Sequence, residues 1–370
     1  MDDLMQEIHS GAFFYDRPFA TENGLMTRYG VSRITARRAL SELEKHGILY
    51  RKRGSGSFVS RDMYEKSDFQ PDSAPFPRGG KGQFAFVLPF NVCRTGLTDA
   101  FKAASDYLSE RGWDAAIYIS DEHGEDQGRA ILSRLTKTGV AGVAYYPGSS
   151  NIQLEMLDHL MLSGKPAVVM DIPSSCRHVA SVSSDNFGGM LALMRHLTGL
   201  GHRRIAFLAD IDPPLRATML DRFSAYMLGL KVDGVVHEPL VYTDMTRASL
   251  ALPPADNRSL PAVLKSFLAQ GITAVVCGND ELAHRVLEAC RDMNIAVPGE
   301  LSVAGFDDSE WATIMPGKRL TTVSQDMPAI GRAVARALCE CMGDALAERK
   351  PVVVPTALVI GNTTGKPREK

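Results

Sequence analysis

Short β-rich runs alternate with helical stretches over most of the chain, and this alternation restricts the fold more than any other feature. The apolar, branched runs cover 84–89, 114–119, 140–145, 166–170, 204–209, 273–277 and 301–305. A strand, a helix and a second strand form a right-handed βαβ unit, and successive units build parallel sheets. Because this region is longer than one doubly wound domain usually is, we predict an α/β fold of two lobes, each with a doubly wound parallel sheet.

The N-terminal part follows a different pattern. Helical spacing and capping residues predict three short helices, over 2–10, 21–29 and 32–46. An apolar stripe in the third helix is predicted to face inward, and it consists of Ile34, Ala39, Leu40 and Leu43. Two strand-like runs, 48–50 and 57–59, then flank a basic turn with glycines at its tip. Three helices and a hairpin make a winged helix-turn-helix of the α+β class.

Composition marks the boundaries between these parts. Between residues 62 and 82 the chain is mostly polar and rich in Pro, Gly and Ser, which prevents long regular elements. The last residues are polar and are expected to fray. The predicted organisation is a winged-helix domain at 1–62, a flexible linker at 63–82, a two-lobed α/β domain at 83–363 and a tail at 364–370.

Charge is distributed unevenly along the chain. The net charge is −2, yet residues 28–61 hold nine Lys and Arg and two acids, which is +7, so the remainder carries −9. Such asymmetry is typical of a small module that binds a polyanion, joined to a larger acidic domain.

The basic segment contains the candidate DNA contacts. A helix in the major groove needs long side chains near its start, and arginine can hold guanine O6 and N7 together. The third helix offers Ser32, Arg33, Thr35, Arg37 and Arg38. In the hairpin, basic side chains can neutralise phosphate and glycines allow close approach to a groove, and these residues are Arg51, Lys52, Arg53, Gly54, Ser55 and Gly56. The alternatives are a solvated basic face and an ordinary hairpin turn.

Several classes of protein are disfavoured. There is no uncharged apolar stretch of membrane-spanning length, and the acidic start MDDLMQEIHS does not resemble a signal peptide. The six cysteines are scattered without CxxC spacing, so we expect a reducing cytoplasm, no structural disulfide and no metal site. No GxSxG, HExxH or Walker motif accompanies the histidines, and we expect neither an enzyme nor a cofactor.

Residues 19–59 resemble the winged-helix domain of the gluconate-repressor (GntR) family of bacterial regulators. The resemblance rests on the turn Tyr29-Gly30-Val31, a helix that begins Ser32-Arg33, the run ARRAL followed by ELE, and the GSGSFV wing. The chain departs from the family at Ala20 and Asn23, where proline and arginine are usual. The resemblance implies a recognition helix and a wing that hold DNA.

Residues 83–363 resemble the effector domain of the lactose-repressor (LacI/GalR) family, which is itself similar to periplasmic sugar-binding proteins. Three stretches carry this resemblance, at 182–210, 221–230 and 274–327. That family's own helix-turn-helix and hinge helix are absent, so the whole chain resembles the hybrid arrangement of arabinose-type repressors. The resemblance implies that Arg222 points into a cleft between the lobes and that Asp280, beside Asn279 in CGNDE, matches a ligand-binding aspartate.

Other effector candidates come from the strand pattern. Ligands of open α/β sheets bind beyond the carboxyl ends of the strands. Polar residues in such places are Asn91, Arg94 and Asp171, with Tyr145 or Tyr146 as a stacking wall. For Asn91, Arg94 and Asp171 the alternative role is turn formation, and one of the two tyrosines would lie in the core. Arg222 could instead form an ion pair with Asp221 or Asp210. Asp280 could instead cap a helix. For Asp307 and Asp308 we favour a structural or hinge role.

The sequence therefore predicts a homodimeric cytoplasmic transcriptional regulator, more specifically a repressor. Its partners are double-stranded operator DNA and a small-molecule effector, most simply a sugar or sugar derivative bound between the lobes, and no membrane. A nucleoside or purine effector is the alternative within the same architecture. A sugar-binding transport or chemotaxis protein is the rival from another class, which the basic module opposes.

Overall fold

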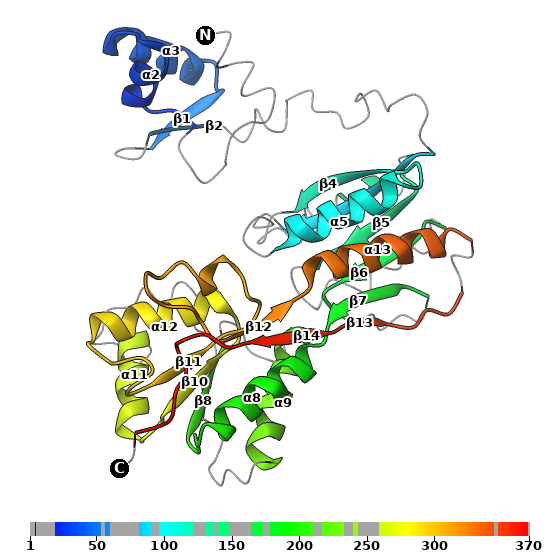
Figure 1. The fold of residues 1–370 in the computed structure, drawn as a ribbon. Helices are drawn as coiled ribbons and strands as arrows, with labels where there is room; N and C mark the ends of the chain where they lie inside the picture. The colour runs from blue at the N-terminus through cyan, green and yellow to red at the C-terminus, as the bar shows by residue number, and fades with distance from the viewer. Residues whose placement is uncertain are drawn as a thin grey trace. The chain divides into compact units, whose positions relative to one another are not determined.

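A computed structural model of the chain describes Leu4 and residues 19–52, 56–59, 81–89, 96–120, 131–132, 134–135, 139–147, 164–172, 178–209, 216–232, 240–242, 259–343 and 347–368. The chain divides into two compact units, Met1–Arg78 and Gly79–Lys370 (Figure 1). Most of the predicted helix 2–10 and most of the predicted linker lie outside the described residues.

The N-terminal unit is a winged helix. Its elements are α2 (Glu22–Tyr29), α3 (Arg33–Lys45), β1 (Leu49–Lys52) and β2 (Gly56–Val59). The Thr21 and Ser32 side chains cap α2 and α3 by accepting from the amides of Gly24 and Thr35. Strands β1 and β2 pair antiparallel as the predicted hairpin. Gly30 ends α2 with a φ of 63°, a left-handed conformation that glycine adopts without strain and that lets the chain turn into α3.

The inward face of α3 differs from the predicted stripe at one position. Ile34 is 81% exposed, and the buried residues of the helix are Ala36, Leu40 and Leu43. These three residues pack with Leu25 of α2. Successive helical residues advance by about 100°, so Ile34 lies nearly opposite Ala36 and only one of the two can face the core. The helix buries the smaller residue and exposes the larger one.

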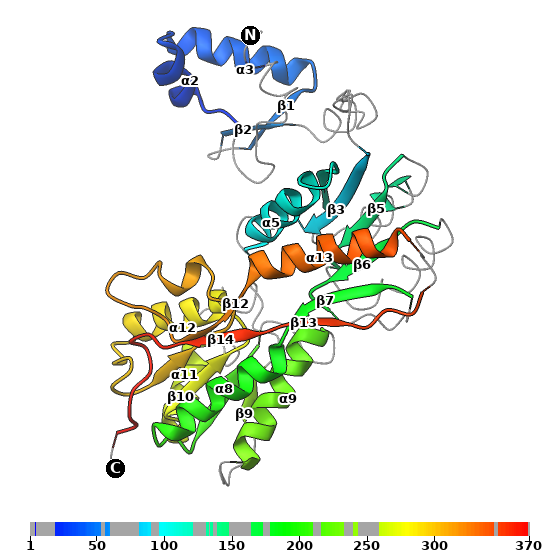
Figure 2. The same cartoon turned by 45° about the vertical axis from the view of Figure 1, so that its right-hand side comes forward.

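The first lobe of the second unit contains a six-stranded parallel sheet in the order β13-β7-β6-β5-β3-β4. Its strands are β3 (Gln83–Pro89), β4 (Asp114–Ser120), β5 (Gly142–Tyr145), β6 (Ala167–Met170), β7 (Ala180–Ser184) and β13 (Val352–Val354). Helices α5 (Leu97–Ser109) and α13 (Met327–Cys341) cover one face side by side (Figures 1 and 2). Both helices contribute buried residues to the core against this face.

The second lobe contains a four-stranded parallel sheet in the order β11-β10-β8-β9. Its strands are β8 (Ile205–Leu208), β9 (Leu240–Tyr242), β10 (Ala274–Cys277) and β11 (Ser302–Ala304). Its helices are α8 (Asn186–Gly199), α9 (Ala217–Val232), α11 (Leu260–Ala269) and α12 (Asp280–Asp292), and a short 3-10 turn, η4, covers Glu310–Ala312. Two apolar clusters fill this lobe, one beneath α11 and α12 and one beneath α8 and α9. The predicted fold class is confirmed for both units.

Within the described ranges, the chain passes between the two lobes three times. The first passage runs from β7 into α8, and the second from β12 (Thr322–Gln325) into α13. The third runs from β13 into β14 (Thr356–Val359), which pairs antiparallel with β12. Strands β12 and β14 lie side by side between the two sheets in both views (Figures 1 and 2). Each lobe is therefore built from sequence segments that are far apart.

Candidate DNA-binding surface and effector site

Two arginines of α3 share one carboxylate of α2. Arg33 donates through Nε to Glu22 at 2.9 Å. Arg37 donates to the same side chain through Nε at 2.8 Å and through Nη2 at 3.4 Å. These hydrogen bonds, that of Arg37 foremost, lower the pKa of Glu22 to about 2 and raise the pKa of Arg37. Glu22 thus stays ionised and fixes the direction of both guanidinium groups, whose remaining N–H groups are left for other acceptors.

The other predicted DNA contacts of α3 lie at its first turns. Ser32 is the N-cap, and its hydroxyl accepts from the Thr35 amide at 3.2 Å. Thr35 and Arg38 are exposed. Among the residues that the structure describes, Arg38 has no hydrogen-bond or ion-pair partner. Ser32 therefore has a structural role at the start of the helix. Arg38 presents an exposed guanidinium group that no described residue pairs with.

The wing is described in part. Arg51 of β1 turns toward α3, where it pairs with Glu44 at 3.1 Å and donates to Ser41 Oγ at 2.9 Å. Lys52 and Gly56 are the ends of the two paired strands. The residues at the tip, Arg53, Gly54 and Ser55, lie outside the described part of the chain. Arg51 thus joins the hairpin to α3.

In the second unit, Arg222 of α9 is the centre of a buried polar network. Its side chain is 8% exposed and lies over the Phe306 ring at 3.8 Å from the centroid. Its Nε donates to Asn186 Oδ1 at 2.8 Å, its Nη1 to the Gly278 carbonyl at 2.6 Å, and its Nη2 lies 3.1 Å from Asp307 Oδ1. Three of the five N–H groups of the guanidinium are thereby used. Of the predicted alternatives, Asp221 is not among these partners, and Asp210 lies outside the described residues.

Asp307, for which the sequence favours a structural or hinge role, is a functional candidate. Its side chain remains 29% exposed although it pairs with Arg222. Its φ is 117°, which is unfavourable for a non-glycine residue and often marks a functional position. Gln325 of β12 donates to Asp307 Oδ1 at 2.7 Å and accepts from Ser184 Oγ of β7 at 2.6 Å. Asp307 therefore connects Arg222 to the strands that join the lobes, and no local sequence pattern reveals this contact.

A second polar pair comes from the first lobe. Tyr146 follows β5 and donates its hydroxyl hydrogen to Asp171 Oδ2 at 2.7 Å, at the end of β6. Burial raises the pKa of Asp171, while Arg216 and Arg222 act in the opposite direction. Burial also raises the pKa of Tyr146, and the charges of Asp171 and Asp307 add to this effect. These mutual influences bring residues of both lobes into one electrostatic cluster, which we call the Arg222 cluster: Tyr146, Asp171, Asn186, Arg222 and Asp307.

Asp280 lies beside this cluster but is enclosed. Its side chain is fully buried, with Oδ1 accepting from Thr322 Oγ1 at 2.6 Å and Oδ2 from the Ser309 amide at 2.8 Å. Burial and the charge of Asp307 raise its pKa to about 8. Asp280 Oδ1 occupies the space where a Cβ on Gly305 would lie, 2.3 Å from that atom. Asp280 thus joins α12 to the loop after β11 and to β12.

The remaining effector candidates have other placements. Asn279 is the N-cap of α12 and accepts from the Leu282 amide at 2.8 Å, the capping role that was considered for Asp280. Tyr145 is 5% exposed within an apolar cluster, so it is the core tyrosine of the pair and Tyr146 is the polar one. Asn91 and Arg94 lie outside the described residues.

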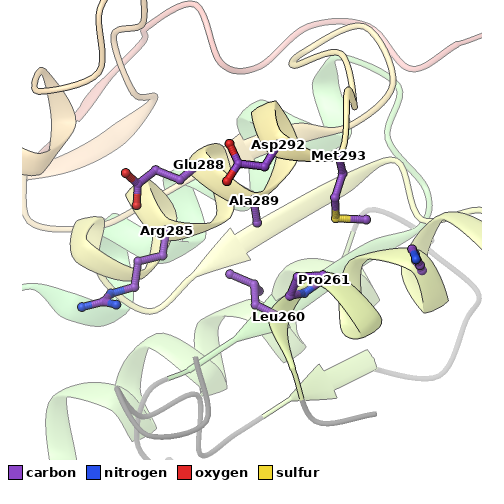
Figure 3. A pocket seen from close by; sticks show the side chains of 8 residues that line it. Leu260, Pro261, Arg285, Glu288, Ala289, Asp292 and Met293 are labelled. Atoms are coloured by element: carbon purple, nitrogen blue, oxygen red, sulfur yellow. The ribbon is translucent and has the colours of Figure 1, made fainter. Parts of the chain in front are cut away.

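A groove of about 410 Å³ lies elsewhere, between α11 and α12 (Figure 3). It is lined by Leu260, Pro261, Lys265, Arg285, Glu288, Ala289, Asp292 and Met293. The charges are of both signs, and the other half of the lining residues are apolar. It shares no residue with the Arg222 cluster.

Two features are absent from the described residues. No group of three or more His, Cys, Asp or Glu side chains there has an arrangement that could hold a metal ion. None of the helices in the described ranges combines the length and the apolar character that crossing a membrane requires.

Family models match both units. Residues 1–59 match the model of the gntR family of bacterial regulatory proteins. Residues 194–364 match the periplasmic binding protein-like domain. The second match spans most of the second lobe, the strands between the lobes and α13.

Two similar curated proteins are each called an arabinose metabolism transcriptional repressor. The protein from Halalkalibacterium halodurans is 25% identical, with 99% of this chain and 96% of the relative aligned. The protein from Geobacillus stearothermophilus is 28% identical, over 98% and 95% of the two chains. Both alignments include the winged helix and the two lobes together.

Solved structures share the fold. A transcriptional regulator CelR in complex with cellobiose has a TM-score of 0.64 and 22% identity, over 93% of this chain and 99% of that one. A LacI family transcriptional regulator from Enterococcus faecium with bound ribose also has a TM-score of 0.64, at 19% identity, over 77% and 100%. At these identities the comparison concerns the fold alone.

Proposed function

Since this chain joins a DNA-binding domain of the GntR family to a periplasmic binding protein-like domain, we propose that it is a transcriptional repressor whose affinity for operator DNA is controlled by a small sugar. The observation that carries the proposal is the Arg222 cluster in a chain whose other unit presents a basic recognition helix. The relatives described above are regulators and not enzymes, and we propose no catalytic step. Binding to chromosomal DNA implies a cytoplasmic protein.

The DNA side of the proposal rests on α3. Arg33, Arg37 and Arg38 lie within its first two turns, which is where a recognition helix contacts base edges. Arginine forks onto guanine in the major groove, and Glu22 already holds two of the three guanidinium groups in fixed directions. Thr35 and the wing residues Lys52 to Gly56 complete the proposed contact surface.

The effector side rests on the chemistry of the Arg222 cluster. A sugar offers neighbouring hydroxyl groups that both donate and accept. Arg222 has N–H groups left to donate, and the carboxylates of Asp307 and Asp171 can accept. Tyr146 adds an aromatic ring of the kind on which a sugar can stack. Asn279 and Asp280 support this site by fixing the start of α12.

We also propose a homodimer. Two-fold symmetric operators need two recognition helices about one DNA turn apart, or a multiple of that distance. Sedimentation of the full-length chain at micromolar concentration should show a dimer, and a monomer at that concentration would contradict this part of the proposal.

A ligand screen followed by a DNA titration tests the function. Pentoses, hexoses, disaccharides and nucleosides are screened for an increase in the thermal midpoint, because a ligand at 100 times its Kd adds about 2.7 kcal/mol of stability. Operator sites are selected from random DNA, and binding is then titrated with and without each hit. We expect a sugar that both stabilises the chain and changes operator affinity. A nucleoside hit would select the alternative effector class, and the absence of a selected operator would contradict the proposed function.

Replacing Arg222 by Lys should weaken effector binding at least tenfold and leave operator affinity without effector nearly unchanged. The reason is that an ammonium group cannot reproduce the fork that a guanidinium presents to neighbouring oxygens. Arg285→Lys is the matched control, because Arg285 is also a helical arginine with an acidic partner, Glu281 at 2.9 Å. Calorimetric titration with the screened sugar measures the effect, and equal losses in both variants would exclude the Arg222 cluster as the site.

A further inference from the structure

The outward pole of α3 carries an apolar side chain among basic ones. Ile34 is 81% exposed, the largest exposure among the large hydrophobic side chains that the structure describes. With an advance of about 100° per residue, Ile34 and Arg38 lie one turn apart on the same face, opposite the buried Ala36. A single exposed isoleucine is ordinary on a protein surface. This one stands at the pole of a helix whose neighbouring positions are all polar or basic.

The neighbours of Ile34 define what it can meet. Arg33 and Arg37 are drawn to the α2 side of the helix by Glu22, at 2.9 Å and 2.8 Å. Thr35 lies on the other side, hydrogen-bonded to Ser32 Oγ at 2.9 Å. The exposed Ile34 side chain therefore lies between the guanidinium groups of Arg33 and Arg37, which Glu22 orients, and the hydroxyl group of Thr35. An anionic partner that carries a small apolar group matches this face in charge and in surface.

We propose that Ile34 reads the C5-methyl group of a pyrimidine, thymine or 5-methylcytosine, in the major groove. This inference rests on the proposed function, since it assigns a specificity residue within the DNA contact. The C5-methyl is the apolar feature of the major-groove edge of a T·A pair, and apolar side chains contact it there. The arginines beside Ile34 supply contacts to phosphate or to guanine, so the methyl group is read next to one of these charged contacts.

The first measurement uses the selected operator and the full-length chain. Each thymine is replaced in turn by deoxyuridine, which lacks only the methyl group, and each cytosine by 5-methylcytosine, which adds it. Burying one methyl-sized group corresponds to about a fourfold change in affinity. We expect a fourfold loss at one thymine of each half-site, or a gain of this size at one cytosine, which identifies the source of the methyl group.

The second measurement assigns that sensitivity to Ile34. Ile34→Ala should bind the unmodified operator about fourfold more weakly and lose its sensitivity to the methyl group at that one position, while Ile34→Val retains part of it. Ile360→Ala is the control, because Ile360 is 64% exposed in the other unit. Since Ile34 makes no buried contact that folding needs, circular dichroism should be unchanged.

The outcomes separate the inference from the function on which it rests. Wild-type binding that ignores every methyl change, or an Ile34→Ala variant that keeps the wild-type sensitivity, overturns the inference and leaves DNA binding intact. A selection that returns no operator overturns the proposed function and this assignment together.

Discussion

At the scale of single residues, the positions of three carboxylates decide how the charged groups of this protein are used. Glu22 is less exposed than the two arginines of α3 that it orients. Asp307 is partly exposed beside Arg222, and Asp280 is fully buried. The three carboxylates differ in how exposed they are and in whether their partners are charged. Their expected behaviour on substitution and titration therefore differs.

Glu22→Gln should weaken specific operator binding while nonspecific DNA binding stays equal or improves. Removing a negative charge near DNA favours binding to any sequence, whereas loss of the carboxylate that directs Arg33 and Arg37 disfavours the specific arrangement. Affinities for operator and random DNA at one salt concentration measure the ratio. Glu42→Gln is the control, because Glu42 contacts Lys45 and not the two arginines. A specificity ratio that does not fall in Glu22→Gln would contradict the positioning role.

Asp280 should make the second unit less stable as the pH rises. Its unfolded pKa is about 3.9, and its folded pKa is raised to about 8. The folded chain keeps a proton that the unfolded chain releases, so this stability is fully present below the unfolded pKa and is lost as the pH rises through the folded pKa. The thermal midpoint of wild type should fall between pH 6.5 and about 9 more steeply than that of Asp280→Asn. Parallel slopes would contradict the assignment, and Asp292→Asn, on the same helix, should keep the wild-type slope.

At the scale of elements, β12 connects the candidate effector site to the passages between the lobes. Gln325 at its end bonds Asp307 on one side and Ser184 of β7 on the other. Asn186, which accepts from Arg222, donates to the Ser184 carbonyl at 3.2 Å and closes a ring of hydrogen bonds. A ligand that moves the side chain of Arg222 or Asp307 would therefore disturb hydrogen bonds to β7 and β12.

Gln325→Ala should reduce the effect of effector on operator affinity more than it reduces either affinity alone. Coupling between two sites is commonly 5- to 150-fold, and we expect a loss of about fivefold or more when the ring is opened. Operator titrations with and without saturating sugar give the coupling. Ser324→Ala on the same strand is the matched control, and an unchanged coupling in Gln325→Ala would show that the ring does not transmit the signal.

The sequence predicts elements better than it predicts contacts between them. The strand expected at 84–89 is β3, Gln83–Pro89, and the helix expected at 32–46 is α3, Arg33–Lys45, because both depend on local periodicity and capping. Strand β7 escaped prediction since its serines, buried at Ser181 and Ser184, interrupt the apolar pattern. The pairing of Arg222 with Asp307 joins residues 85 positions apart, and only the packed fold brings them together.

At the scale of the whole molecule, the division into Met1–Arg78 and Gly79–Lys370 separates the proposed DNA contact from the proposed effector site. Each unit has its own apolar core, that of the winged helix around Leu25 and Leu40. The two functions proposed here therefore depend on separately stabilised parts of one chain.

Calorimetry of the full chain should show two unfolding transitions. The screened sugar should raise the midpoint temperature of only one of them. A ligand stabilises the unit that binds it, through mass action on the folded state of that unit. Operator DNA should raise the midpoint temperature of the other transition. A single transition that both ligands shift equally would indicate that the units unfold together.

The three passages between the lobes also set the order in which the chain can fold during synthesis. The first lobe begins at β3, but its helix α13 and its edge strand β13 end only at Cys341 and Val354. The first lobe therefore cannot close before Val354 has been made, whereas the last strand of the winged helix, β2, ends at Val59. The winged helix can thus fold while the strands of the first lobe are still being made.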